Sequence, residues 1–175
     1  LGQKVTGEGA GRSWRELVFR YGERAPGPQD TLWIPPSAER VRELAYYDWH
    51  PLGVERRRAE TILEVAKRAR RLEPLDRDEA LKRLAAMSGI GPWTLGHVAS
   101  AVYGDADAVP VGDYHLPHLV SYVLAGEPRA DDARMLELLE PFRPHRGRVV
   151  ALLQLGGKGP ERRGPRLSVR DIRGQ

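Results

Sequence analysis

Residues 84–94, Leu-Ala-Ala-Met-Ser-Gly-Ile-Gly-Pro-Trp-Thr, contain a very short link between two segments with the apolar spacing of amphipathic helices. Gly89 and Gly91 allow a tight reversal because glycine adopts a positive φ at little cost, and Pro92 suits the first turn of a helix. The two helices must therefore pack as neighbours. The N–H groups that begin the second helix favour an anion such as a phosphate, although a glycine pair between helices is more often only a turn.

Helical spacing recurs on both sides of this link. Asp76 followed by Glu79 predicts a capping box at the start of the helix before the link, and Gly104 predicts the end of the helix after it. Nearer the N-terminus, Ser13 and Ser37 are the expected caps of two earlier helices. Three more periodic stretches follow Gly104, and no segment has the alternation of a strand. We therefore predict an all-α fold.

The composition excludes several classes of protein. The chain has 175 residues, of which 41% are hydrophobic and 30% charged, so it is neither a disordered tail nor a membrane protein. It has no cysteine, which excludes disulfides, thiolate nucleophiles and cysteine-ligated metal sites. The formal net charge of +4 is supplied by residues 158–175. A basic end on an otherwise balanced chain suggests a polyanionic partner, or simply a solvated terminus.

The link and a later loop together resemble the helix-hairpin-helix DNA glycosylase superfamily, and within it the 3-methyladenine DNA glycosylase II branch. The later loop reads Val109-Pro-Val-Gly-Asp-Tyr114, which places Asp113 twenty positions after Trp93, the spacing of the family's essential aspartate. Residues 3–6 resemble the family's opening helix, and residues 144–155 resemble its closing helix. The resemblance thus covers nearly the whole chain.

This resemblance implies a two-lobed helical bundle with a cleft between the lobes. Residues 1–104 would form the lobe that contains the helix-hairpin-helix at 81–103, and residues 105–175 the lobe with the catalytic aspartate and the basic tail. By this resemblance, the small sheet domain that often precedes this core in the family would be missing from these residues. Leu1 would fall inside the first core helix, so we expect exposed apolar surface where that N-terminal domain packs.

The resemblance also implies the chemistry. Asp113 would face the deoxyribose of a nucleotide rotated out of the duplex and stabilise the positive charge that builds as the N-glycosidic bond breaks. On spacing alone, a helix N-cap is the simpler interpretation of Asp113. Superfamily members that also cut the strand have a lysine where this chain has Trp93. Because no lysine lies between Lys82 and Lys158, we expect no lyase step.

Aromatic residues are the candidates for the base pocket. Trp93 would either stack on a cationic alkylated purine or anchor the hairpin in the core. Tyr46 and Trp49 are further stacking candidates, although such residues more often pack in cores, and Tyr114 would assist beside Asp113. The closing helix lacks the aromatic that the family often presents to the base, so base selectivity is less determined than DNA binding.

Phosphate contacts are expected from the second hairpin helix, the closing helix and the arginines of the basic tail, with these residues outside the tail: Gly89, Gly91, Thr94, Arg146 and Arg148. The family's hairpin also binds a monovalent cation, Na⁺ or K⁺, through main-chain carbonyls, which by position would be those of Ala85, Met87 and Ile90. No other cofactor is expected. His115 and His118 share a helix face but lack a third ligand at suitable spacing, so we reject a metal pair.

Together these inferences predict a monofunctional DNA glycosylase that excises alkylated purines of the 3-methyladenine type in base-excision repair. It would act as a monomer on double-stranded DNA in the cytoplasm, and the excess of arginine over lysine, 24 to 4, suggests a bacterial source. Three alternatives stay open: a glycosylase for mispaired adenine or a deaminated purine, a non-catalytic helix-hairpin-helix DNA-binding module, and a fragment that binds DNA without activity.

Overall fold

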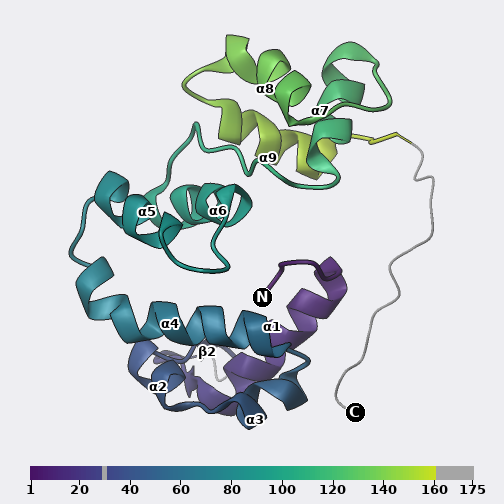
Figure 1. Cartoon of the computed structure of the whole chain (residues 1–175). Helices are drawn as coiled ribbons and strands as arrows, with labels where there is room; N and C mark the ends of the chain where they lie inside the picture. Colours follow the sequence, from purple (N-terminus) through teal and green to yellow (C-terminus); the bar gives the residue numbers. More distant parts are fainter. Residues whose placement is uncertain (29–30, 161–175) are drawn as a thin grey trace. The chain divides into compact units, whose positions relative to one another are not determined.

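The computed structural model describes residues 1–28 and 31–160, and these residues are mainly helical (Figure 1). Beside the helices they form one antiparallel ribbon of two short strands, β1 (Glu23–Arg24) and β2 (Trp33–Ile34). The sequence predicts no strand, because two residues are too few to show an alternating pattern. The predicted all-α class is confirmed. None of the helices in these two ranges is long and apolar enough to cross a bilayer.

Contacts within the described chain divide it into two units. The first comprises residues 1–75, and the second begins at Asp76 and includes the remaining described residues. The family resemblance predicts a boundary after Gly104 instead. That residues 1–104 and 105–175 form the two lobes stays a prediction. The observed division groups the hairpin with the helices that follow it, because the loop after Gly104 bonds back to the hairpin helices.

The first unit contains α1 (Gly7–Tyr21), α2 (Ala38–Glu43), α3 (Tyr46–Trp49), the 3-10 turn η1 (His50–Leu52) and α4 (Arg56–Leu72). Their inward faces form a core of buried side chains: Leu17, Val41, Leu44, Trp49, Leu52, Val54 and Ala59. Ser37 caps α2 as predicted. Ser13 does not cap α1; it is buried inside the helix, which begins earlier because the Thr6 hydroxyl accepts the Gly9 N–H at 3.1 Å.

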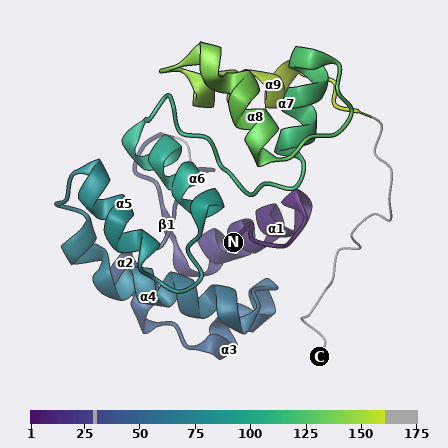
Figure 2. The same cartoon turned by 45° about the horizontal axis from the view of Figure 1, so that its top comes forward.

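The second unit contains α5 (Arg77–Ala85), α6 (Pro92–Tyr103), α7 (Leu116–Ala125), α8 (Asp132–Leu139), the 3-10 turn η2 (Glu140–Phe142) and α9 (Arg146–Gly156). Helices α7, α8 and α9 pack around a buried core of Leu116, Val120, Met135, Leu139 and Val150, and Figure 2 shows these three helices side by side. Asp76 caps α5 and Gly104 ends α6 in the left-handed conformation, as predicted.

The hairpin between α5 and α6 has the tight geometry that its sequence predicts. The Met87 N–H donates to the Leu84 carbonyl at 2.9 Å, and the Ile90 N–H donates to the Met87 carbonyl at 3.2 Å. Gly89 has a φ of 85°, which a residue with a side chain rarely adopts. Pro92 is the first residue of α6, so the two helices follow each other directly and pack together.

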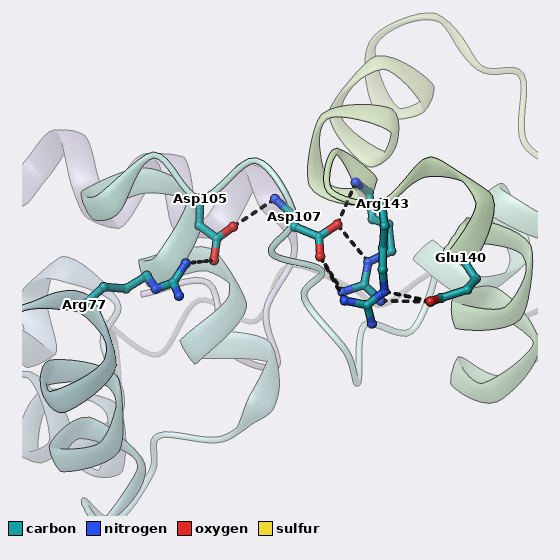
Figure 3. Close-up of polar contacts among 6 residues, drawn as sticks. Arg77, Asp105, Asp107, Glu140 and Arg143 are labelled. Atoms are coloured by element: carbon teal, nitrogen blue, oxygen red, sulfur yellow. Dashed lines mark hydrogen bonds and ion pairs between the residues drawn. The ribbon is translucent and has the colours of Figure 1, made fainter.

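An ionic clamp fixes the loop of residues 104–112 to α5 on one side and to α9 on the other (Figure 3). Asp105 accepts an Arg77 hydrogen bond at 2.9 Å and also accepts the Asp107 N–H at 2.9 Å. Asp107 in turn accepts two hydrogen bonds from the Arg146 guanidinium, at 2.9 and 2.7 Å, and the Arg146 backbone N–H at 3.1 Å. The loop is therefore held by side chains far from it in sequence.

The clamp corrects one site prediction. Arg146 is expected to contact DNA phosphates, but its side chain is only 14% exposed and lies against Asp107, with Glu140 at 3.5 Å. A guanidinium enclosed by two carboxylates is a structural partner, because a phosphate would have to displace them. Arg148 is exposed, and its backbone N–H donates to the Ala106 carbonyl at 3.1 Å. Its phosphate contact stays a prediction, and the tail arginines lie outside the described residues.

Two glycines let helices approach the same loop closely. A Cβ atom on Gly96 of α6 would lie 2.7 Å from the Pro110 Cα, and one on Gly147 of α9 would lie 2.5 Å from the Ala108 carbonyl oxygen. Both distances are shorter than any stable contact, and both neighbours are backbone atoms, which cannot rotate away. The loop is thus enclosed by α6 and α9 as well as clamped by charge.

The close approach at Gly96 predicts the effect of a single methyl group. Gly96→Ala should lower the free energy of unfolding by about 1–3 kcal/mol, because the overpacking outweighs the better helix propensity of alanine. The matched control is Gly11→Ala in α1, where nothing lies within 4 Å of the new Cβ and a gain of about 0.5–1 kcal/mol is expected. Urea unfolding measures both; a Gly96→Ala protein as stable as Gly11→Ala would contradict the packing.

The clamp predicts a pH dependence of stability. Hydrogen bonds from the Arg146 side chain lower the pKa of Asp107, although burial opposes the shift. A carboxyl group whose pKa falls on folding stabilises the protein above its unfolded pKa of about 4, and this contribution is lost as pH falls through the folded pKa. Asp107→Asn should therefore cost about 2 kcal/mol at pH 7 and much less near pH 3.

Urea unfolding at both pH values tests this expectation. Asp78→Asn is the matched control, because Asp78 pairs with Arg77, the arginine that holds Asp105, from a side chain that is 80% exposed and should matter little. An Asp107→Asn protein that loses the same free energy at pH 7 and pH 3 would show that the Asp107 charge does not stabilise the loop.

Candidate active site

Asp113 lies between the clamped loop and α7, and its first carboxylate oxygen caps that helix. Oδ1 accepts the backbone N–H groups of His115 at 2.8 Å and Leu116 at 2.9 Å. These donors begin α7 and have no carbonyl partner within the helix. His115 is the N-cap residue of α7, and Asp113, two residues earlier, accepts these N–H groups in the manner of a cap. This capping is compatible with a catalytic role, because the half-buried carboxyl group retains some exposure.

The second carboxylate oxygen faces the hairpin. Trp93, the second residue of α6, donates its indole N–H to Asp113 Oδ2 at 3.0 Å. The indole ring also meets the His97 ring edge-on, one helical turn along, with centroids 4.5 Å apart. The hairpin and the aspartate are therefore in direct contact.

The environment keeps Asp113 ionised. Burial raises the pKa of the carboxyl group, but the hydrogen bonds from the His115 N–H, the Trp93 indole and the Leu116 N–H outweigh it, and the net pKa is lowered. Hydrogen bonds donated to a carboxylate favour its charged form. At neutral pH the group is thus an anion of fixed orientation and a weak base.

The backbone before Asp113 is fixed as well. Gly112 has a φ of 92°, and its N–H donates to Asp132 Oδ2, at the start of α8, at 3.1 Å. A Cβ on Gly112 would lie 4.0 Å from the Trp93 Cβ, so this backbone passes close to the indole. The position of Asp113 is therefore set from both sides, by Gly112 before it and by α7 after it.

The aromatic residues predicted to line the base pocket differ in how far they are buried. Tyr114 is 78% exposed and lies edge-on to His115 and His118. Tyr46 is partly buried, and the Arg56 guanidinium lies 4.3 Å from its ring centroid. Trp49 is completely buried in the first core, so the stacking role predicted for it is wrong for this folded state, and packing is its function. Stacking by Trp93, Tyr46 or Tyr114 stays a prediction.

The ligand sites proposed on the hairpin backbone stay predictions. Gly91 precedes α6, and nothing lies within 4 Å of a Cβ built on it, so a ligand can approach its backbone closely. Of the carbonyls suggested for a monovalent cation, those of Ala85, Met87 and Ile90, the Met87 oxygen already accepts the Ile90 N–H. A carbonyl oxygen has two lone pairs, so this bond still permits a cation there.

Side-chain metal sites are a separate matter. Within residues 1–28 and 31–160, no group of three or more His, Asp or Glu side chains could hold a metal ion. His118 uses Nδ1 to accept the Ala130 N–H at 3.2 Å. This bond gives His118 a structural role.

Sequence reasoning missed the residues that support Asp113. No sequence pattern singles out Arg77 and Asp132, which bond the loop that leads to Asp113, or Asp105, through which Arg77 holds that loop. The signal available in the sequence was two aspartates, Asp105 and Asp107, in a short loop after a helix end. Aspartates in such loops usually hydrogen-bond to nearby backbone, and their arginine partners 28 and 39 positions away cannot be inferred locally.

No family model matches the chain. Two curated proteins of Bacillus subtilis (strain 168) are similar in sequence. One, named DNA-3-methyladenine glycosylase, is 23% identical over 150 residues, covering 82% of this chain and 50% of that protein. The other, YfjP, provisionally named as the same kind of enzyme, is 26% identical over 138 residues, covering 74% of this chain and 46% of that protein. The chain spans about half the length of these relatives.

Solved structures share the fold. The 3-methyladenine DNA-glycosylase from Archaeoglobus fulgidus gives a TM-score of 0.77 at 23% identity, covering 88% of this chain and 54% of that one. MBOgg1, solved with a low-affinity DNA ligand, gives a TM-score of 0.71 at 16% identity, covering 86% of this chain and 54% of that one. Identities this low show the fold alone. The described residues have the fold of the helix-hairpin-helix DNA glycosylases, and the resemblance to that superfamily predicted from the sequence is confirmed.

Proposed function

We propose that this chain is the catalytic part of a monofunctional DNA glycosylase that removes alkylated purines of the 3-methyladenine type from double-stranded DNA. The observation that carries the proposal is the ionised Asp113 carboxylate, which is held by two backbone N–H groups at the start of α7 and by the Trp93 indole N–H of α6. The fold and the names of the similar proteins support the same activity.

The lowered pKa of Asp113 favours an electrostatic role. As the N-glycosidic bond breaks, its electron pair leaves with the base and positive charge builds on the deoxyribose. A fixed, partly desolvated carboxylate stabilises that charge. Water then adds to the anomeric carbon and releases a proton to solvent. A carboxylate with a lowered pKa is a poor base, so we assign no proton abstraction to Asp113.

The proposed substrate class follows from the role of Asp113, which stabilises positive charge and transfers no proton. A purine alkylated at N3 or N7 is cationic and leaves as a neutral base, so it needs little help from a general acid. The partners that lower the Asp113 pKa, the His115 and Leu116 N–H groups and the Trp93 indole, are all donors to its anionic form. An anion beside the sugar and a substrate that is itself a good leaving group complement each other.

Replacement of Asp113 tests the proposal. Asp113→Asn should reduce excision from methylated duplex DNA by about a hundredfold or more, because asparagine retains a capping oxygen but carries no charge. Released base and alkali-labile sites are the readouts. Asp131→Asn is the matched control, because Asp131 caps α8 through the Arg134 N–H at 2.9 Å and should tolerate the change without loss of activity.

Other results of these assays would distinguish the alternative functions. Equal base release by native and Asp113→Asn protein would refute the mechanism. Retention of duplex in a gel shift without excision of any base would identify a DNA-binding module or a fragment without activity. Excision of mispaired adenine or a deaminated purine instead of alkylated purines, in a substrate panel, would identify the alternative glycosylase.

Monofunctionality has its own test. Trp93 offers no amine for a Schiff base, and its indole N–H already donates to Asp113. Borohydride treatment during excision should therefore trap no covalent protein–DNA adduct, and strand scission should require hot alkali. An adduct on a denaturing gel would contradict this expectation, and peptide mapping would then identify the amine responsible.

A further inference from the structure

We propose that Trp93 is a positioning residue that orients the Asp113 carboxylate through its indole N–H, an inference that rests on the proposed function. The sequence predicts that Trp93 either stacks on the flipped base or anchors the hairpin in the core. The hydrogen bond of 3.0 Å from Nε1 to Asp113 Oδ2 gives it a third role.

The two carboxylate oxygens of Asp113 have different tasks. Oδ1 accepts the two N–H groups that begin α7, at 2.8 and 2.9 Å, and so serves the helix cap. Oδ2 accepts the indole N–H, and a carboxylate oxygen has a second lone pair that can still face the sugar. Bonds to both oxygens prevent the group from rotating about its Cβ–Cγ bond. The indole therefore determines where the charge on Oδ2 points.

Trp93 is itself fixed well enough to act in this way. Its ring meets the His97 ring edge-on at 4.5 Å, and Pro92 before it begins the helix. The Gly112 backbone passes close to the Trp93 Cβ, in a left-handed conformation that favours glycine. The donor is thus attached to the hairpin and the acceptor to α7, so this bond joins the two elements that the proposed reaction requires together.

Replacement of Trp93 by phenylalanine separates positioning from stacking. Phenylalanine keeps an aromatic face but donates no hydrogen bond, so a stacking role would survive in part and a positioning role would be lost. Loss of the donor removes one of the bonds that favour the ionised form, and the Asp113 pKa should rise. Activity that needs ionised Asp113 should then be lost at higher pH than in the native protein.

The first measurement is independent of activity. Carboxyl-detected NMR titration of the native and Trp93→Phe proteins reports the Asp113 pKa, and the backbone amide chemical shifts of both proteins are the control for an intact fold. We expect the Asp113 titration to move to higher pH while the amide shifts away from residue 93 stay in place. An unmoved Asp113 titration in a folded variant would overturn the proposal.

The second measurement is the kinetics of excision from methylated duplex. We expect a loss of about tenfold to a hundredfold in kcat with little change in KM, and an acid limb shifted to higher pH. A rise in KM with kcat unchanged would assign Trp93 to stacking and overturn positioning. If the native protein excises no base, the proposed function is wrong, and so is the role of Trp93 in catalysis. An Asp113 titration that still moves in Trp93→Phe would then show only that the hydrogen bond exists.

Discussion

The hydrogen bonds that converge on the Asp113 carboxylate connect the two halves of the second unit. Two backbone N–H groups of the first turn of α7 and the indole of Trp93 on α6 donate to one side chain. A half-buried carboxylate needs such donors because removal from water without them would cost several kcal/mol. The same donors that permit the charge to be partly buried also fix its direction, so stability and proposed chemistry share one set of contacts.

The loop before Asp113 makes this arrangement possible. Residues 104–112 lead from α6 to Asp113, and in isolation a loop of this length would sample many conformations at an entropic cost to folding. Arg77 and Arg146 hold its two aspartates, and Gly96 and Gly147 admit its backbone between α6 and α9. The loop contacts thus help to position Asp113 in addition to the hydrogen bonds made to its carboxylate. Arg146 therefore stabilises the loop by binding Asp107 and does not act as a free surface cation.

Local rules predicted the parts of the fold that depend on neighbours in sequence. The caps at Ser37 and Asp76, the positive φ of Gly89 and the start of α6 at Pro92 each involve residues within four positions, so their physics is present in a short window. Ser13 failed as a cap because Thr6 offers an equivalent hydroxyl earlier in the same helical stretch. Periodicity cannot choose between two such hydroxyls.

The candidate site was predicted in outline but not in its contacts. The family resemblance singled out Trp93 and Asp113 by their spacing, but the hydrogen bond between them depends on how α6 and the following loop pack. Trp49 failed for a related reason: helical spacing cannot tell an aromatic residue that lines a pocket from one that fills a core, and only burial decides.

A carboxylate held by donors on both oxygens also restricts the substrates that it can serve. Every bond that lowers the Asp113 pKa makes the group a better stabiliser of positive charge and a worse acceptor of a proton. His118 uses Nδ1 for the Ala130 N–H, which ties that histidine to the backbone. A site of this kind favours substrates whose leaving group already carries positive charge, because stabilising the sugar is then the main task left to the protein. The alkylated-purine substrate that we propose rests on this charge state of Asp113.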